Sequence, residues 1–141
     1  RNRWFLDISL DNLTLGRAWM MQAEKEGTRD FHRAAAYLDR AVEGLRESGN
    51  QDDLPRGLLA RAACSRLQGL FSRAHQDLQE AKEIAEQGEM KLHLIDYHLE
   101  TARLCLAQNN PLQAKDHFNT AADMIKKTGY HRRDPEMMND E

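Results

Sequence analysis

The chain has 141 residues, of which 40% are hydrophobic and 30% are charged, and its formal net charge is −3. This composition excludes a disordered chain and supplies enough apolar material for one globular core. The acidic balance leaves no basic excess to neutralise phosphates, and no apolar run approaches the roughly 20 residues that a membrane span needs. We therefore expect neither nucleic acid nor a membrane as a partner.

Helical periodicity of the apolar residues runs through nearly the whole chain and predicts six helices. In chain order we expect them at about 7–26, 30–48, 54–68, 71–87, 90–108 and 111–128. Glycine marks several of the predicted ends, and Pro55 and Pro111 mark two predicted starts. No stretch alternates with period two over several residues, so the sequence predicts an all-α fold without a sheet.

The helices repeat in pairs, and the second helix of each pair recurs after 40 residues. Residues 31–41 read FHRAAAYLDRA and residues 71–81 read FSRAHQDLQEA. Alanines match without gaps at this interval, as Ala34, Ala74 and Ala114, and again as Ala41, Ala81 and Ala121. The first helices align as Leu15, Leu59 and Leu99, and as Ala18, Ala62 and Ala102, with about four extra residues in the first unit. Helices that cross closely need small side chains, so these alanines are predicted to lie at helix crossings.

This pattern of small residues resembles the tetratricopeptide repeat. Two sets of residues fit the family's motif: Ala62, Ala74, Leu78 and Ala81, then Ala102, Ala114, Phe118 and Ala121. The period of 40 is longer than the family's usual 34 or so, as in its long-helix branch. Residues 54–62 and 129–136 also resemble stretches in the C-terminal repeat region of bacterial signal-transduction ATPases.

The resemblance implies antiparallel helix-turn-helix units, at about 7–49, 54–88 and 90–129, stacked as a right-handed superhelical solenoid. They would form a single domain over residues 1–130. Residues 131–141 would be a polar tail or the truncated start of a further helix. In such a family the first helix of each pair lines a concave groove that holds proteins or peptides.

The resemblance places groove candidates on the first helices, at Asn12, Trp19, Arg56, Asp96 and Arg103. Tryptophan and arginine are frequent anchors of protein recognition. An alternative interpretation is that Trp19 packs against the inserted segment of the first unit or against a neighbouring unit. Exposed terminal helices add self-association as a further expected mode.

No motif for catalysis or nucleotide binding is present in the sequence. His93 and His98 fall on different helix faces, the other histidines look scattered, and neither a metal nor another cofactor is expected. Cys64 and Cys105 are expected in the core, which favours a reducing cytoplasm. The sequence thus predicts a non-enzymatic module that binds a protein or peptide and forms the sensing or regulatory part of a larger protein. The alternative is an enzyme or metal-binding helical domain whose site is assembled between helices.

Overall fold

A computed structural model describes residues 2–129, and within this range the chain forms six α-helices and no strand. They are α1 (Asn2–Glu26), α2 (His32–Glu47), α3 (Leu54–Leu67), α4 (Phe71–Gln87), α5 (Lys91–Ala107) and α6 (Pro111–Thr128). The predicted all-α class is confirmed, and the predicted bounds agree within two residues except at the start of α1. That helix begins five residues early, and its extra turn places Leu6 against the core. The predicted tail at 131–141 lies outside the described residues.

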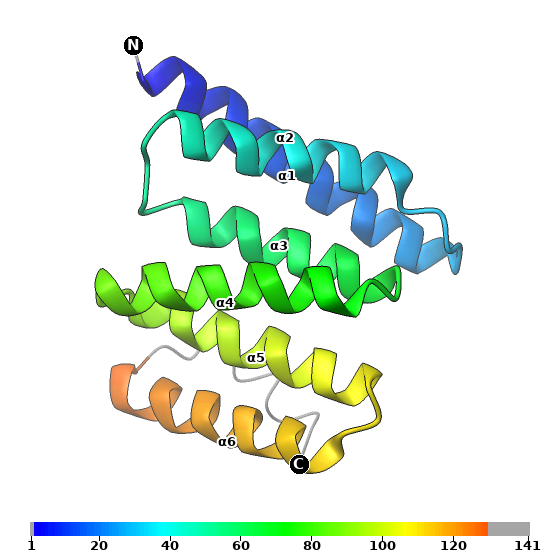
Figure 1. The fold of residues 1–141 in the computed structure, drawn as a ribbon, viewed down its shortest axis with the longest axis vertical. Helices are drawn as coiled ribbons and strands as arrows, with labels where there is room; N and C mark the ends of the chain where they lie inside the picture. Colours follow the sequence, from blue (N-terminus) through cyan, green and yellow to red (C-terminus); the bar gives the residue numbers. More distant parts are fainter. Residues whose placement is uncertain (1, 130–141) are drawn as a thin grey trace.

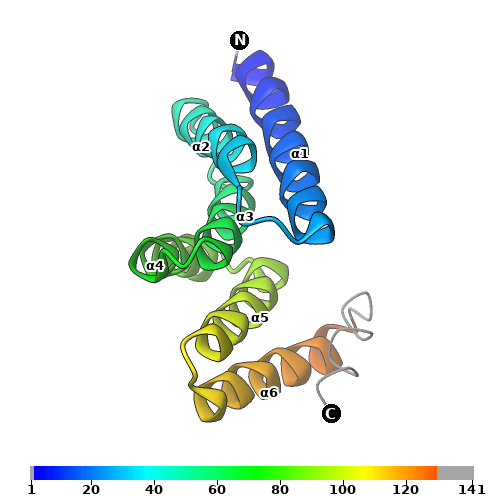
Figure 2. The same ribbon diagram turned by 90° about the vertical axis from the view of Figure 1, so that its right-hand side faces the viewer.

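The helices pack in sequential pairs: α1 with α2, α3 with α4, and α5 with α6 (Figure 1). The pairs follow one another along the long axis of the molecule, joined by contacts of α2 with α3 and of α4 with α5. The first helices of successive pairs also contact each other, α1 with α3 and α3 with α5. Within residues 2–129 the backbones of the second helices do not approach each other as closely. Figure 2 shows α2 and α4 as neighbours on one side of α3. The pairs therefore open between their second helices.

The helix boundaries follow from local chemistry. Asn110 caps α6, because its side chain accepts a hydrogen bond from the backbone N–H of Gln113, and Pro111 occupies the first turn. Between α3 and α4 the chain turns at Gly69, whose φ of +78° lies in the left-handed region that glycine adopts without strain. These signals are local, which is why the sequence predicts them well.

The predicted crossing alanines of the second and third pairs are buried. Ala62, Ala74, Ala102 and Ala114 are all at most 1% exposed, so they allow the close approach of their helices. The alanines at 34, 41, 81 and 121 are buried to the same degree.

The predicted register of α1 is wrong. Leu15 and Ala18, aligned with buried residues of the later pairs, are exposed. Leu13 and Gly16 are buried instead, and a Cβ atom added at Gly16 would lie 2.6 Å from Leu38 Cδ2. The physical reason is the longer connection between the two helices of the first pair. It moves the point where α1 and α2 approach most closely toward the N-terminus of α1, so that Gly16 occupies the position expected for Ala18.

Candidate functional site

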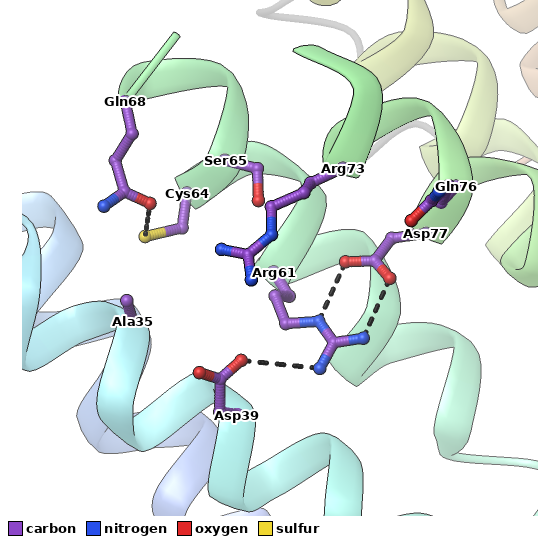
Figure 3. A pocket seen from close by; sticks show the side chains of 9 residues that line it. All are labelled: Ala35, Asp39, Arg61, Cys64, Ser65, Gln68, Arg73, Gln76 and Asp77. Carbon is purple, nitrogen blue, oxygen red and sulfur yellow. Dashed lines mark hydrogen bonds and ion pairs between the residues drawn. The ribbon is translucent and has the colours of Figure 1, made fainter. Parts of the chain in front are cut away.

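A polar groove lies between α2 and α4, with α3 as its floor (Figure 3). It encloses about 230 Å³, and we call it the α2–α4 groove. It exists because the second helices of the first two pairs diverge while α3 contacts both. Its walls carry side chains from all three helices, namely Ala35, Asp39, Arg61, Cys64, Ser65, Gln68, Arg73, Gln76 and Asp77.

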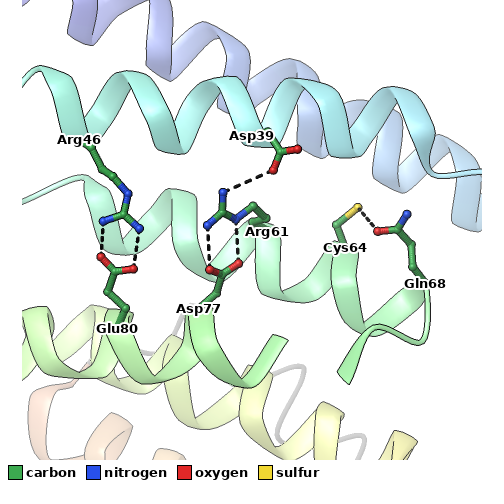
Figure 4. Close-up of polar contacts among 7 residues, drawn as sticks. All are labelled: Asp39, Arg46, Arg61, Cys64, Gln68, Asp77 and Glu80. Atoms are coloured by element: carbon green, nitrogen blue, oxygen red, sulfur yellow. Dashed lines mark hydrogen bonds and ion pairs between the residues drawn. The ribbon is translucent and has the colours of Figure 1, made fainter. Parts of the chain in front are cut away.

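Arg61 ties the three helices of the groove together. Its Nε donates to Asp77 Oδ2 at 2.8 Å and its Nη2 donates to Asp77 Oδ1 at 2.9 Å, which is a bidentate contact from α3 to α4. Its Nη1 reaches Asp39 Oδ1 on α2 at 3.4 Å (Figure 4). The hydrogen bonds to Asp77 raise the pKa of the Arg61 guanidinium above its ordinary value. Arg61 therefore stays charged and fixes the separation of α2 and α4.

A second ion pair crosses the same gap. Arg46 on α2 binds Glu80 on α4 through Nη2 to Oε1 at 2.6 Å and through Nη1 to Oε2. Figure 4 shows the Arg46 and Arg61 pairs side by side along α2 and α4. Hydrogen bonding to Arg46 lowers the pKa of the Glu80 carboxyl. Both side chains of this pair are substantially exposed, so it contributes less to stability than the more buried pair at Arg61.

Arg73 is the charged group of the groove that stays available. It projects from the first turn of α4 into the groove beside Arg61 (Figure 3). No carboxylate within residues 2–129 forms an ion pair with it. The amides of Gln68 and Gln76 and the hydroxyl of Ser65 line the same space. A planar guanidinium with neutral hydrogen-bonding groups around it is suited to a carboxylate carried on a polar chain.

The five predicted groove residues all lie on first helices, as the alignment implies, and none of them lines the α2–α4 groove. Trp19 is 36% exposed, and the Cζ atom of Arg33 lies 4.7 Å from its ring centroid. Trp19 also lines a cavity with Thr28 and Asp30 of the connection between α1 and α2. The alternative reading of this tryptophan, in which it lies against the inserted segment, therefore agrees with its surroundings.

The other four predicted residues are spread over three helices. Asn12 is half-buried on α1, and Arg56 pairs with Asp53 at 3.3 Å next to the start of α3. Asp96 and Arg103 lie on α5, where Arg103 Nη1 contacts Glu100 Oε1 at 3.2 Å. Whether these side chains bind a partner stays a prediction.

Glu100 on α5 was not among the residues that the sequence singled out. Its side chain is only 6% exposed, and Arg66 Nε on α3 donates to its Oε2 at 2.6 Å. Together with Arg103 this makes a buried carboxylate with two arginine partners. The network joins the second pair of helices to the third, so its first role is structural.

The sequence treated the histidines as scattered, which is wrong for His98 and His117. Their Nδ1 atoms lie 3.0 Å apart, on α5 and α6. Burial, followed by the charge of His117, lowers the pKa of His98 to about 4, and burial also lowers the pKa of His117. A signal was available: the two are 19 residues apart, the same interval that separates the buried Ala102 from Ala121 across this hairpin.

We expect this pair to make the stability of the chain depend on pH. The folded-state pKa of His98 lies below its unfolded value near 6.5, so its contribution is fully present above pH 6.5 and is lost as the pH falls toward 4. The charge of Lys82 opposes protonation of both rings, and the charge of Asp116 favours protonation of His117. Because both rings are partly accessible to solvent, we expect the free energy of unfolding to fall by about 1–2 kcal/mol. Urea denaturation at pH 7 and at pH 4.5 measures this difference in the free energy of unfolding.

The matched comparison for this expectation is His98→Gln against His32→Gln. His98→Gln will reduce the loss of stability between the two pH values, because no ring remains to be protonated at the buried position. His32 is exposed, so its replacement will leave the pH profile of the wild type unchanged. Equal pH profiles for His98→Gln and the wild type would contradict the expectation.

We also searched residues 2–129 for a metal site, a membrane-spanning helix and a reactive thiol. Three or more His, Cys, Asp or Glu side chains are nowhere in this range arranged to hold a metal ion. None of the described helices combines the length and apolar character of a membrane span. Cys64 and Cys105 are buried free thiols, and burial raises the pKa of Cys64 to about 11, which agrees with the predicted core role.

In comparisons with known proteins, no family model, no curated protein and no solved structure matches this chain. A function therefore has to be inferred from the groove and its surroundings.

Proposed function

We propose that the chain is a non-enzymatic module that binds a protein or peptide, and that the α2–α4 groove receives an acidic segment of that partner. The observation that carries the proposal is Arg73. Its guanidinium points into the groove, and within residues 2–129 it has no carboxylate partner. Arg61, in contrast, is already satisfied by Asp39 and Asp77. A carboxylate from a partner would thus meet a free donor on a wall that is held in place.

The wider architecture supports an interaction role. We propose that the three helix pairs stack as a right-handed solenoid of the tetratricopeptide type. Two observations support this proposal. Alanines at equivalent positions of the pairs are buried, and the first helices of successive pairs contact each other while the second helices diverge. Such stacking curves with the first helices inside, so the α2–α4 groove would lie on the outer face. Arg56, Asp96 and Arg103 would then belong to the inner face as a second surface for a partner. In the observed register of α1, Asn12 and Trp19 are no longer equivalent to these positions.

A solenoid of this kind commonly acts as part of a larger assembly. We therefore retain the proposal that the chain is the sensing or regulatory part of a larger protein. Such a role needs fixed spacing between helix pairs. The ion pairs of Arg46 with Glu80, Arg61 with Asp39 and Arg66 with Glu100 join successive pairs.

The experiment is a selection of random twelve-residue peptides displayed on phage against the 141-residue chain. We expect the enriched peptides to carry an acidic residue. Fluorescence anisotropy with the best peptide will show about tenfold weaker binding to Arg73→Gln, which corresponds to about 1.4 kcal/mol for one charge-assisted contact. Arg40→Gln is the matched control, because Arg40 is exposed on α2 and lies over Tyr37 outside the groove.

Other outcomes would contradict either the location of the binding site or the peptide-binding function itself. A peptide that binds Arg73→Gln normally but is lost in Trp19→Ala/Arg103→Glu would move the site to the first helices. The absence of any enriched peptide would argue against a peptide-binding module. The alternative of a metal-dependent site has its nearest candidates in His98 and His117, and stoichiometric metal in the purified chain would favour it.

A further inference from the structure

Helix α1 carries an apolar stripe on an exposed flank beside its buried face. Its members are Trp4, Ile8, Leu15 and Trp19, which are 64%, 40%, 43% and 36% exposed. At about 100° per residue these four side chains fall within a sector of roughly 60° on the helix surface. We call them the α1 stripe. Large apolar side chains gathered on one exposed face mark a surface for association.

A comparison with α3 shows what kind of surface this is. On α3 the corresponding line packs against α2, and it includes Arg61, which contacts Asp39. If the buried Gly16 of α1 is aligned with the buried Ala62 of α3, Leu15 takes the place of Arg61. Within residues 2–129, α1 contacts α2 and α3, and Arg33 of α2 lies over the Trp19 ring, but all four stripe side chains stay at least 36% exposed. The stripe is therefore a surface that remains available to a further helix.

The order of side chains along the stripe favours a second copy of this chain as the occupant. Trp4 and Trp19 lie at equal distances from the midpoint between Asp11 and Asn12, and so do Ile8 and Leu15. The stripe therefore has the same order of side chains from either end: aromatic, aliphatic, aliphatic, aromatic. An interface between two identical subunits related by a two-fold axis requires such self-complementarity.

We propose that a second copy of this chain covers the stripe, with the two α1 helices packed antiparallel about a two-fold axis near Asp11 and Asn12. In this arrangement Trp4 of each copy lies opposite Trp19 of the other. Ile8 of each copy lies opposite Leu15 of the other. The stripe is separate from the α2–α4 groove, so dimerisation and peptide binding can be lost independently.

A cavity at the end of the first helix pair fits the same arrangement. It encloses about 510 Å³ beside Trp19 and is also lined by Ala23 and Arg33. Trp4 of the second copy faces this end of α1, and its indole ring would enter the cavity. The guanidinium of Arg33, already stacked on Trp19, would then lie near a second aromatic ring. Aromatic side chains seated in pockets are the usual anchors of protein interfaces.

The interface would be small and would have one unfavourable feature. A single pair of crossing helices buries an area at the low end for stable complexes, so we expect a dissociation constant in the micromolar range, on the order of 10 µM. The Asp11 side chain borders the stripe at its centre and is exposed. In the dimer the two Asp11 carboxylates would approach each other near the axis and repel.

Sedimentation of the full 141-residue chain over about 1–200 µM tests the proposal. We expect a monomer–dimer equilibrium that stops at the dimer. Ile8→Glu will weaken it at least tenfold, and Asp11→Leu will strengthen it about tenfold by removing the repulsion. Met21→Ala is the matched control, because Met21 is 67% exposed on the same helix but lies off the stripe. The chain has two tryptophans, both on the stripe, so their emission will also shift to shorter wavelength as the dimer forms.

Three results would overturn the proposal. One is a chain that stays monomeric over the whole range. Another is an equilibrium that Ile8→Glu leaves unchanged while circular dichroism shows a folded variant. The third is growth beyond a dimer that is abolished by Leu112→Glu, at a 78% exposed residue of α6, because it would indicate head-to-tail packing of α6 on α1.

Discussion

Replacing Arg61 with methionine will lower the free energy of unfolding by about 3 kcal/mol, the usual cost of leaving one partner of a buried ion pair alone. Methionine keeps the apolar stem of the side chain and removes the guanidinium. The side chain of Asp77, only 10% exposed, then loses both hydrogen bonds that arginine donates. Asp39 is 66% exposed and is hydrated without its partner. Urea denaturation of the variant and the wild type measures the difference.

Two further variants isolate the buried charge as the cause. Arg46→Met removes the exposed ion pair on the same helices and will cost less than about 1 kcal/mol. Arg61→Met/Asp77→Leu removes both charges and will regain most of the stability, because no unpaired carboxylate remains. If Arg61→Met costs no more than Arg46→Met, the contact between Arg61 and Asp77 does not hold the two walls of the groove.

The two variants at Arg61 also separate stability from binding. With Arg61→Met, α2 and α4 lose the residue that bridges them through α3, so the groove should widen and a bound acidic peptide should be weakened. The double variant restores stability without restoring the bridge. Peptide affinity that stays low in the double variant would therefore reflect the geometry of the groove rather than partial unfolding.

The helices were predictable because the signals that form them are local. Apolar periodicity, Pro55, Pro111 and the glycines at the turns act within a few residues, and five of the six predicted helices agree closely with the structure. The crossings at Ala62 and Ala102 were predictable as well, since the later pairs keep one spacing between their helices.

The candidate site was not predictable in the same way, because its contacts join residues far apart in the chain. Asp77 lies 16 residues after Arg61, and Glu100 lies 34 residues after Arg66. The pairing of Arg66 with Glu100 depends on how one helix pair rotates against the next, and the pairing of Arg61 with Asp77 depends on how α4 packs on α3. The α2–α4 groove depends in addition on the divergence of two helices whose backbones do not approach each other, and no sequence period encodes that distance. His98 and His117 are intermediate, because they share a hairpin and a known spacing.

The register of α1 shows where alignment by residue type fails. Matching alanine with alanine placed Ala18 at the helix crossing, whereas Gly16 occupies it and Ala18 is exposed. A glycine at a crossing gives a weak sequence signal, because it looks like a helix breaker. Here it has a packing reason, since Leu38 fills the space that a side chain would need.

The same substitution at these two positions tests the register. Gly16→Leu will lower the free energy of unfolding by about 3 kcal/mol, because Leu38 is fully buried and cannot move aside. Gly16→Ala, the milder variant should leucine prevent folding, will cost about 1–2 kcal/mol despite the better helix propensity of alanine. Ala18→Leu will change stability by about 0.5 kcal/mol or less, since its side chain points to solvent.

Urea denaturation of the three variants compares the two registers directly. A large loss at position 18 together with a small loss at position 16 would restore the register expected from the alanine alignment. That result would also rotate α1 and bring Leu15 toward the core. The α1 stripe would then no longer face outward as one surface, so the register of this helix decides whether the surface proposed for dimerisation exists.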